Sequence, residues 1–458
     1  MRLRADAGLR GAEAVRRALE GATRAGAESA DALLVERDTI ECRVRGEEID
    51  FVTQARERTL GIRAFVAGPG GRRSAVVSTS DLAPGSIDRI AAEAVALAGA
   101  TAPDPCAGLP EDGFGAAPDD LALFDPADRA VAVEARVAEA RRAERAAREC
   151  DPRIANSEGS GASSQFAEVV YGNTAGFLGA YASASHSLHA EPVAAENGAM
   201  QRDSWLSVAR RLADLDDAAG VGREAARRAL ARLGARRVPT CEVAIVFEPR
   251  TARSLLVQLA GCLSGYAVYR DASYLADRLG ERVASELVTV IDDGRRPGGL
   301  GSHPFDGEGL PPRRNVLVER GRLGSWLLDG YSARKLGLRS TGNAVRSAAG
   351  APSAGPTNLW LEPGTQTPEE IVASTGRGLL VTELIGQGFN PVTGDYSRGA
   401  AGLWIENGEI AHPVEEVTIA GNLGEMLAAV DAVGSDLLWL GRVAAPTLRV
   451  ARMTVAGA

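Results

Sequence analysis

The chain has 458 residues, of which 45% are apolar and 24% charged, and 60 acidic residues against 51 basic ones give a formal charge of −9. This composition excludes wholesale disorder and fibrous repeats. The acidic balance argues against nucleic acid as the main partner, because phosphate binding needs a basic footprint. At roughly 150 residues per domain, the length predicts two or three domains.

The first hundred residues are predicted to form a compact α/β unit. Helical periodicity is expected over residues 13–25 and again over 86–98, where Ser86 is a candidate N-cap. Strands are expected at residues 30–35 and 39–44, and alternating apolar and polar residues predict two more, at 60–67 and 74–80. The Gly68-Pro69-Gly70-Gly71 run between the last two strands indicates a hairpin with a glycine-rich loop.

The central region is predicted to hold a linker, two helices and a hairpin. A stretch rich in Pro, Gly and Asp indicates a linker over residues 101–126. A long Ala/Arg/Glu helix is expected over 127–150, because opposite charges recur three and four residues apart. Two strands within 166–189 should meet at the turn 173–176, and a further helix is expected over 221–233.

Short strands, glycines and tight turns dominate the C-terminal half. A strand over 241–247 leads into a helix over 249–263, and apolar strands are expected at 287–291 and 379–385. Tight hairpins are predicted at residues 317–323 and 404–410. The Asn-Gly pair in the second hairpin suits a type I′ turn.

Together these elements predict an α+β protein. Residues 1–235 should form an N-terminal α/β domain with helices packed on a sheet, made of a first unit (1–100), the linker (101–126) and a central region (127–235). Residues 236–458 should form a β-rich C-terminal domain, as a sandwich or a distorted barrel.

The compartment is predicted to be the cytoplasm. The charged N-terminus does not resemble a secretory signal, and no stretch approaches the roughly 20 apolar residues that span a bilayer. The cysteines form no C-x-x-C pair and no disulfide framework. They are scattered along the chain as Cys42, Cys106, Cys150, Cys241 and Cys262.

No histidine cluster in the sequence has the spacing of a zinc site. His186 and His189 lie in one predicted strand, where a spacing of three residues places them on opposite faces. His303 and His412 each precede a proline in a loop. No H-E-x-x-H pattern is present, so a zinc site held by this chain is not expected.

Acidic residues gather around two predicted turns. Asp292 and Asp293 follow the strand at 287–291, and Asp306 and Glu308 come shortly after. Carboxylate oxygens suit Ca²⁺ or Mg²⁺, but the spacing matches no EF-hand loop. Turns rich in Asp and Gly at strand ends are common for geometric reasons, so a structural role is favoured over a metal site.

Nucleophilic catalysis has little support in the sequence. There is no G-x-S-x-G elbow, and Cys262 near a helix end is expected to be a buried structural thiol. Residues 386–391 follow an apolar strand, and their glycines could let another backbone approach closely. The alternative is a wide turn.

Short motifs occur along nearly the whole chain. They are Leu60–Arg63, Asn156–Gly159, Val283–Glu286 leading to Asp292–Gly294, Phe305–Gly309, Ser332–Gly337 with Ser340–Asn343, Thr393–Gly399, Trp404–Glu409 and Val417–Leu423. Their order and spacing resemble the TldD/TldE (PmbA) family.

Two segments that would carry zinc ligands indicate to which branch of the family the chain is similar, because both lack the ligand residues. TldD-like members of the family carry a His-Glu-x-x-x-His helix that binds zinc, and this motif falls on residues 256–261 here. Leu256 and Gly261 occupy the histidine positions and Val257 the glutamate position. The segment that would carry a cysteine ligand, between residues 437 and 446, is also missing. The chain therefore resembles the TldE/PmbA branch, with no metal and no catalytic residue of its own.

The resemblance implies a non-catalytic subunit of a heterodimeric TldD/TldE zinc metallopeptidase that cleaves unfolded or extended peptides. It implies that the zinc sits in a TldD-like partner, that this chain needs no cofactor, and that the chain homodimerises when alone. Substrate contact is expected at the end of one C-terminal strand and the loop after it. The residues are Leu384, Ile385, Gly386, Gln387, Gly388, Phe389 and Asn390.

Two other functions remain open. One is a stand-alone peptide-binding or regulatory protein, to which the family's older link with DNA gyrase belongs. The other is a homodimeric hydrolase in which Asp292, Asp293 and Asp306 hold a metal. A co-encoded TldD-like chain with an intact zinc motif would favour the heterodimer over both.

Overall fold

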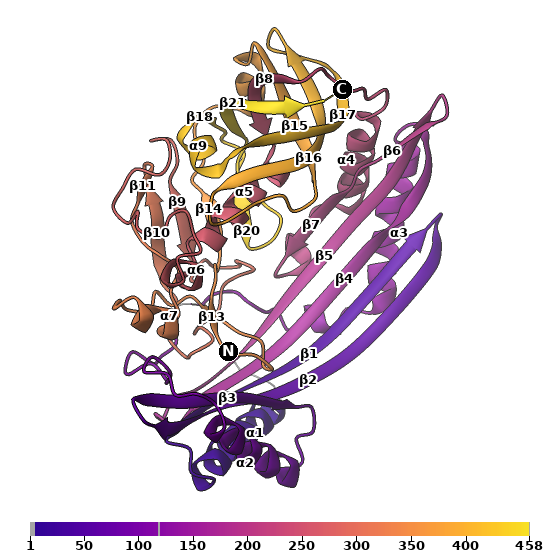
Figure 1. Cartoon of the computed structure of the whole chain (residues 1–458). Coiled ribbons are helices and arrows are strands. Elements are labelled where there is room, and N and C mark those ends of the chain that lie inside the picture. Colours follow the sequence, from indigo (N-terminus) through magenta and orange to yellow (C-terminus); the bar gives the residue numbers. More distant parts are fainter. Residues whose placement is uncertain (1–4, 118–119, 458) are drawn as a thin grey trace.

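One antiparallel sheet forms the frame of the N-terminal half (Figure 1). The computed structural model describes residues 5–117 and 120–457, so positions 1–4 of the predicted first unit and 118–119 of the predicted linker lie outside the described residues. The strand order is β3-β2-β1-β4-β5-β6, and β7 pairs with β5. The strands are β1 (Ser29–Arg45), β2 (Glu48–Gly68), β3 (Gly71–Thr79), β4 (Ile154–Asn173), β5 (Leu178–Glu196), β6 (Ala199–Arg202) and β7 (Trp205–Ala209).

The strands of this sheet are longer than predicted, and β1 is continuous. The prediction of two strands at 30–35 and 39–44 is wrong, because the charged residues between them do not break the strand. Glu36, Arg37 and Asp38 lie opposite Arg58, Glu57 and Arg56 of β2. Of these facing residues, Arg56 and Asp38 form an ion pair at 3.4 Å, which stabilises the pairing of the two strands. The predicted turn at 173–176 is confirmed, between β4 and β5.

Four helices cover one face of this sheet at its two ends (Figure 1). The pair α1 (Ala5–Arg24) and α2 (Pro84–Gly99) packs at one end, and α3 (Val133–Glu149) and α4 (Ala218–Leu230) pack at the other. The N-cap prediction for Ser86 is wrong, since α2 begins at Pro84 and the Ser86 hydroxyl donates to Asp81 instead. The predicted helix at 127–150 starts later, after a short 3₁₀ turn.

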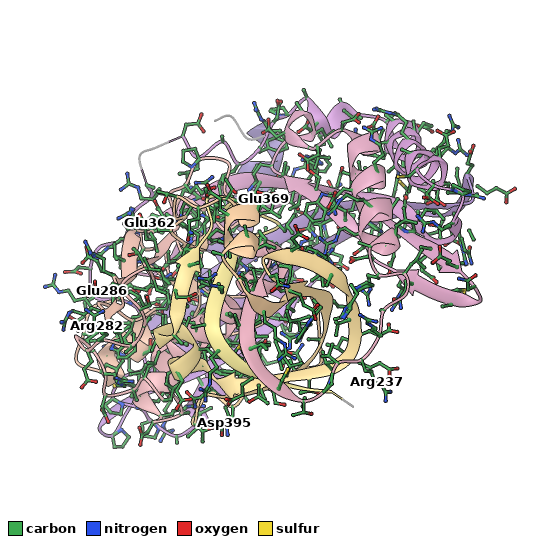
Figure 2. The ribbon with its side chains drawn as sticks, turned by 90° about the horizontal axis from the view of Figure 1, so that it is seen from above. Arg237, Arg282, Glu286, Glu362, Glu369 and Asp395 are labelled. Atoms are coloured by element: carbon green, nitrogen blue, oxygen red, sulfur yellow. The ribbon has the colours of Figure 1, made fainter. Side chains whose placement is uncertain are left out.

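A closed five-stranded barrel forms much of the C-terminal half, which confirms the predicted α+β class and selects the barrel over the sandwich. The order is β17-β16-β15-β8-β21, and pairing of Thr418 in β17 with Ala456 in β21 closes the ring. Figure 2 views its curved strands from above. Arg282 and Glu286 are labelled at the left edge of the molecule, away from the barrel. The bounds are β8 (Cys241–Phe247), β15 (Arg377–Ile385), β16 (Asp395–Glu406), β17 (Glu409–Asn422), β18 (Val430–Val433, beside β21) and β21 (Leu448–Ala456).

A second sheet lies beside the barrel, with the order β11-β10-β9-β14-β20-β19. Its strands are β9 (Val290–Asp293), β10 (Arg314–Glu319), β11 (Arg322–Leu323), β14 (Leu359–Leu361), β19 (Leu438–Trp439) and β20 (Val443–Ala445). The remaining elements are α5 (Pro249–Cys262), α6 (Gly265–Tyr269), α7 (Gly330–Lys335), α8 (Pro368–Ala373), α9 (Leu423–Ala428), β12 (Ala344–Val345) and β13 (Ser353–Ala354).

Both predicted C-terminal hairpins are confirmed. Residues 317–323 form the β10–β11 hairpin, and residues 404–410 form the turn between β16 and β17. Asn407 and Gly408 have φ values of 53° and 80°, the left-handed conformation that a type I′ turn requires. The strand predicted at 287–291 begins and ends a few residues later than expected, because only Val290–Asp293 pairs with β10 and β14.

The two halves meet on the face of the long sheet that the helices leave open. Because side chains alternate along a strand, Leu33 and Tyr171 point away from the helices. They form a buried cluster with Phe305 and Ala348 of the C-terminal half. This contact places loops of the C-terminal half directly against the N-terminal sheet.

Candidate functional site

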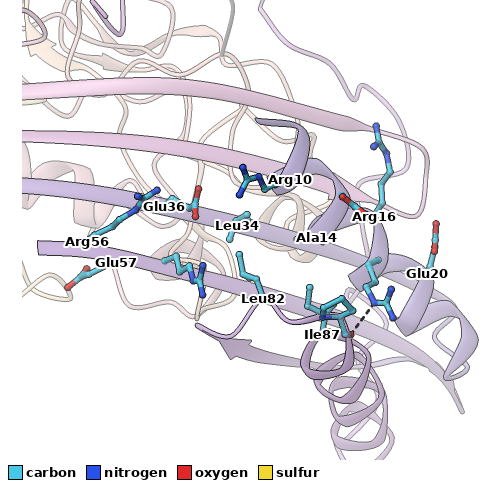
Figure 3. Close-up of a pocket in the computed structure, with 15 residues that line it drawn as sticks. Arg10, Ala14, Arg16, Glu20, Leu34, Glu36, Arg56, Glu57, Leu82 and Ile87 are labelled. Atoms are coloured by element: carbon cyan, nitrogen blue, oxygen red, sulfur yellow. Dashed lines mark hydrogen bonds between the residues drawn. The ribbon is translucent and has the colours of Figure 1, made fainter. Parts of the chain in front are cut away.

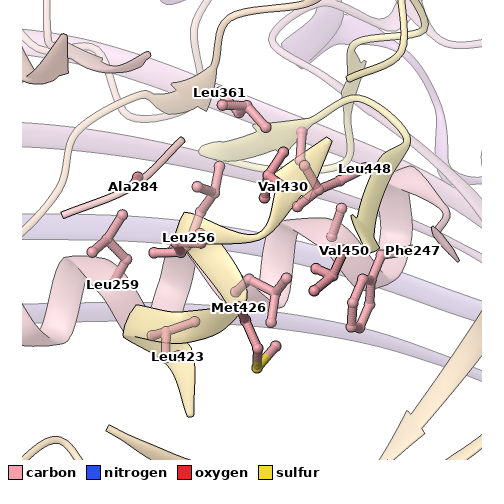
Figure 4. Close-up of a cluster of buried hydrophobic side chains, with 14 of the residues drawn as sticks. Phe247, Leu256, Leu259, Ala284, Leu361, Leu423, Met426, Val430, Leu448 and Val450 are labelled. Atoms are coloured by element: carbon pink, nitrogen blue, oxygen red, sulfur yellow. The ribbon is translucent and has the colours of Figure 1, made fainter. Parts of the chain in front are cut away.

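Residues 256–261, on which the family's zinc motif is expected to fall, lie on α5, which packs between the barrel and the second sheet. Leu256 is 3% exposed and lies in the C-terminal hydrophobic core with Leu259 and Val430 (Figure 4). Val257 is 49% exposed, and a side chain at Gly261 would meet open space. Two aliphatic side chains and a glycine offer no nitrogen, oxygen or sulfur donor, so these positions do not fit a zinc ion.

Histidines and cysteines elsewhere do not replace the missing ligands. His186 and His189 lie on opposite faces of β5, as predicted; His186 is buried beside Ser164, 2.8 Å from its hydroxyl. Burial raises the pKa of the Cys262 thiol to about 12, which keeps it protonated and unreactive. Across residues 5–117 and 120–457, no three His, Cys, Asp or Glu side chains are arranged to hold a metal ion.

The predicted acidic residues serve separate hydrogen-bond sets. Asp292 accepts from the amide of Asn343 at 2.7 Å and from the backbone N–H and hydroxyl of Thr357 at 2.7 and 2.8 Å. Asp306 accepts backbone N–H groups on both oxygens. Burial raises the pKa of each carboxyl to about 7. Asp293 accepts a hydrogen bond from the backbone N–H of Arg295 at 2.8 Å. The three carboxylates therefore hold loops in place and do not share a metal site.

The segment expected to contact a peptide, residues 384–390, is the end of β15 and the loop that leads to β16. Its middle is exposed, and Ile385 is 58% exposed. Gly388, however, lies against the protein's own β16. A Cβ there would come within 1.7 Å of the Ser397 carbonyl oxygen, and the Ser397 N–H donates to the Gly388 oxygen at 2.8 Å. The small residue therefore serves this internal contact, and the peptide role of the segment stays a prediction.

A buried ion network, which sequence reasoning missed, joins the two halves. Asp31 of β1 accepts hydrogen bonds from Arg63 at 2.5 and 2.9 Å and from Arg346 at 2.7 Å. Arg63 also lies 3.5 Å from Glu308. Burial alone would raise the pKa of Asp31, but Arg346 and Arg63 outweigh it and hold that pKa below its usual value. The signal was a single acid inside the apolar strand predicted at 30–35.

A hollow lies on the helix face of the long sheet (Figure 3). It is a groove of about 1380 Å³ between α1, the middle of β1 and β2, and the start of α2. Its rim mixes both signs of charge, with Arg10, Arg16 and Arg56 among the bases and Glu20 and Glu57 among the acids (Figure 3). Such a mixed lining gives no preference for a ligand of one charge.

Family models match most of the chain. The PmbA/TldA metallopeptidase domain 1 matches residues 30–98, the central domain 126–233, and the C-terminal domain 240–457. The chain belongs to the PmbA/TldD metallopeptidase family. Within that family, α5 holds residues 256–261, on which the zinc motif is expected to fall.

Relatives and solved structures agree with this assignment. Metalloprotease PmbA of Escherichia coli O157:H7 is 38% identical over 97% of this chain and 96% of its own length. A PmbA homolog of Haemophilus influenzae is 35% identical over the same shares. A crystal structure from Bacteroides thetaiotaomicron, whose name links it to modulation of DNA gyrase, superposes with a TM-score of 0.89 at 25% identity, covering 97% of this chain and 98% of its own.

The fold is also that of TldE from Thermococcus kodakarensis, with a TM-score of 0.86 at 24% identity over 96% of this chain and 99% of that one. No helix among the described residues is long and apolar enough to cross a membrane.

Proposed function

We propose that this protein is the non-catalytic subunit of a cytoplasmic heterodimeric zinc metallopeptidase that cleaves unfolded or extended peptides. A TldD-like partner supplies the zinc and the general base. This chain supplies the second wall of the peptide chamber. An extended peptide fits such a chamber because strand addition reads the backbone and not the sequence.

The observation that carries the proposal is that α5 lacks zinc-ligating side chains at the positions where the family's motif is expected. The chain keeps the family's whole body, but Leu256 is packed into the core and Val257 and Gly261 carry no ligand atoms. A fold retained without its metal ligands is explained most simply as one half of an enzyme whose other half keeps them.

Exposed apolar side chains at one end of the long sheet support an assembly. Ile49 and Val52 lie near the β1–β2 turn, and Met200, 71% exposed, lies in β6 beside the β5–β6 turn at the same end. Obligate partners bury large, apolar interfaces, on the order of 2,000 Å² or more. We therefore expect the lone chain to self-associate as a dimer and to form a one-to-one complex when a TldD-like chain is supplied.

Co-expression with the TldD-like chain of the same organism tests the proposal. Size-exclusion chromatography with light scattering should show a heterodimer, and elemental analysis should find one zinc per heterodimer. The complex should cleave an unstructured casein-type peptide, and a His→Ala change in the partner's zinc motif should abolish that cleavage. Matched changes on this chain's helix, Val257→Ala and Gly261→Ala, should leave cleavage unchanged.

The opposite results would overturn the proposal. Loss of cleavage in Val257→Ala or Gly261→Ala would mean that α5 of this chain takes part in the chemistry. A chain that stays monomeric and ignores the TldD-like partner would favour a stand-alone peptide-binding or regulatory protein, the function to which the gyrase-linked names of its structural neighbours point.

A further inference from the structure

A groove of about 520 Å³ runs between the two halves of the molecule. One wall is the open face of the long sheet, with Val35 of β1, Gln165 of β4 and Ser185 of β5. The other wall consists of the loop at residues 300–307 and the segment at 344–346. We call it the arginine groove, after the side chains that line it: Arg37, Arg210, Arg346 and Arg442.

Three of the four arginines of the arginine groove have no carboxylate partner within the described ranges, and the fourth, Arg346, pairs with Asp31. Its one lining carboxylate, Asp306, is occupied by backbone N–H groups on both oxygens. Among the residues that the structure describes, Arg37 and Arg442 have no ion-pair or hydrogen-bond partner for their side chains, and Arg37 Nε is buried. Arg210 donates only to backbone carbonyls, including those of Gly299 and Ala184, so its charge has no carboxylate partner either.

Arg346 presents a vacant hydrogen-bonding edge. Its side chain is 0% exposed, and Nη1 binds Asp31 at 2.7 Å. Its Nε and Nη2 atoms are buried and have no partner among the described residues. These two atoms form the edge of a guanidinium that donates two parallel hydrogen bonds to a carboxylate. Buried donors without a partner are rare, because such a group gives up its hydrogen bonds to water and gains none in return.

His303 adds an acceptor to the same groove. Its Nδ1 lies 2.9 Å from the Gly301 carbonyl oxygen, so Nδ1 carries the proton and Nε2 keeps its lone pair. Burial lowers the pKa of this imidazole to about 4, so the ring is neutral at physiological pH. The buried Nε2 has no partner in the described part of the chain. The groove thus offers several donors for an anion, and the unpartnered His303 Nε2 is available to accept an N–H or O–H group.

We propose that the arginine groove binds the carboxyl terminus of a peptide. The free edge of Arg346, together with Arg37 and Arg442, takes the carboxylate, and His303 Nε2 accepts the N–H of the last peptide bond. This inference rests on the proposed function for the peptide nature of the ligand, and it adds that the bound end is the negatively charged one. The volume suits a short peptide end, since ligand pockets of this kind measure roughly 300–1,000 Å³.

A nucleic acid fits the groove less well than a peptide. The whole chain carries a formal charge of −9, which repels a polyanion that approaches from outside. A phosphodiester also brings no N–H group for the unpaired acceptor of His303. A terminal carboxylate can accept from the unpaired guanidinium donors of Arg346, and the adjacent peptide N–H can donate to the unpaired Nε2 of His303.

Fluorescence anisotropy on the isolated full-length chain tests the inference. The probe is a fluorescein-labelled Ala/Ser pentapeptide with a free C-terminal carboxylate, compared with the same peptide as its C-terminal amide. Loss of a charge-assisted bidentate contact should weaken binding of the amide at least about tenfold. Arg37→Gln and Arg442→Gln should weaken the acid peptide by a comparable factor and leave the amide unchanged. Both variants should fold, because neither side chain has a partner to lose.

Arg339→Gln is the matched control, since Arg339 is an exposed arginine outside the groove and the charge change is the same. It should bind the acid peptide as the unaltered chain does. Equal affinity for acid and amide, or equal loss in Arg339→Gln and Arg442→Gln, would overturn the inference. Binding of a single-stranded hexanucleotide in place of the acid peptide, lost in Arg442→Gln, would overturn it in favour of a phosphate site.

The outcome can be separated from that of the proposed function. Anisotropy needs neither the partner nor cleavage. A zinc-containing heterodimer that cleaves peptides but whose isolated subunit ignores the carboxylate would refute this inference alone. Carboxylate binding by a chain that forms no heterodimer would refute the proposed function alone.

Discussion

Asp31→Asn should be one of the most destabilising conservative changes in the chain. The Asp31 side chain is fully buried and bonds two guanidinium groups, those of Arg63 and Arg346. The amide keeps the shape of the carboxyl but loses its charge and turns one acceptor into a donor. Arg346 is then left with no acid partner, and Arg63 keeps only Glu308 at 3.5 Å.

The expected magnitude follows from the burial of the network. Removing one partner of a buried ion pair leaves an uncompensated charge and costs about 3–5 kcal/mol. The exposed pair between Arg43 and Asp50 gives the matched control, because its side chains are 44% and 37% exposed. Breaking an exposed pair costs about 0–1 kcal/mol. Asp31→Asn should therefore lower the free energy of unfolding several times more than Asp50→Asn.

Equilibrium urea unfolding, followed by circular dichroism and tryptophan fluorescence, measures the difference. Arg346→Gln and the double variant complete a cycle, in which removal of both partners should cost less than the sum of the single changes. The pKa of Asp31 lies below its unfolded value of 3.8, so the stabilisation is present above that pH. It is lost as the pH falls through the folded-state pKa. Equal costs for Asp31→Asn and Asp50→Asn, or strict additivity in the cycle, would refute the reasoning.

Other substitutions give further expectations. Gly388→Ala should lower the urea unfolding midpoint, because its Cβ would meet the Ser397 carbonyl oxygen at 1.7 Å. Gly261→Ala, on α5 with open space around it, should stabilise the chain by about 0.5–1 kcal/mol. Urea midpoints of the two variants equal to that of the unaltered chain would contradict both expectations. Burial raises the pKa of Asp292 to about 7, so the folded chain holds more protons than the unfolded one between about pH 4 and 7 and loses stability as pH rises. Asp292→Asn should remove this pH dependence of stability, as a comparison of urea unfolding at pH 5 and pH 8 will check. Elemental analysis of the isolated chain should find no stoichiometric zinc, because Leu256 and its neighbours carry no ligand, and one tightly held zinc per chain would contradict this.

Local chemistry explains which parts of the fold the sequence predicted. Asn407-Gly408 predicts its hairpin correctly, since only residues that tolerate positive φ can form a two-residue type I′ turn. The sequence also shows that Leu256, Val257 and Gly261 carry no zinc-ligating atoms, because ligation depends on the atoms that a side chain carries. That these positions mark a lost zinc motif stays a prediction. In both cases the deciding property belongs to a few neighbouring residues.

Non-local contacts explain where the predictions were wrong. The charges at 36–38 suggested a break in a strand, but they face opposite charges about 20 residues further along the chain, on β2. Gly388 lies against the chain's own Ser397, a neighbour that the local pattern could not identify, and the peptide role of its segment stays a prediction. A pattern of residue types reports the polarity of a position but not the identity of its neighbour.

The sequence by itself determined the α+β class, the turns and the absence of a zinc motif. Only the tertiary structure decided that Asp31 and Arg346 pair across the molecule, 315 positions apart, and that Arg37, Arg210 and Arg442 line the same groove. The physical reason is that an arginine is most often a solvated surface residue. An arginine becomes part of a buried ion pair or of a binding groove only when distant segments of the chain fold around it and remove its water.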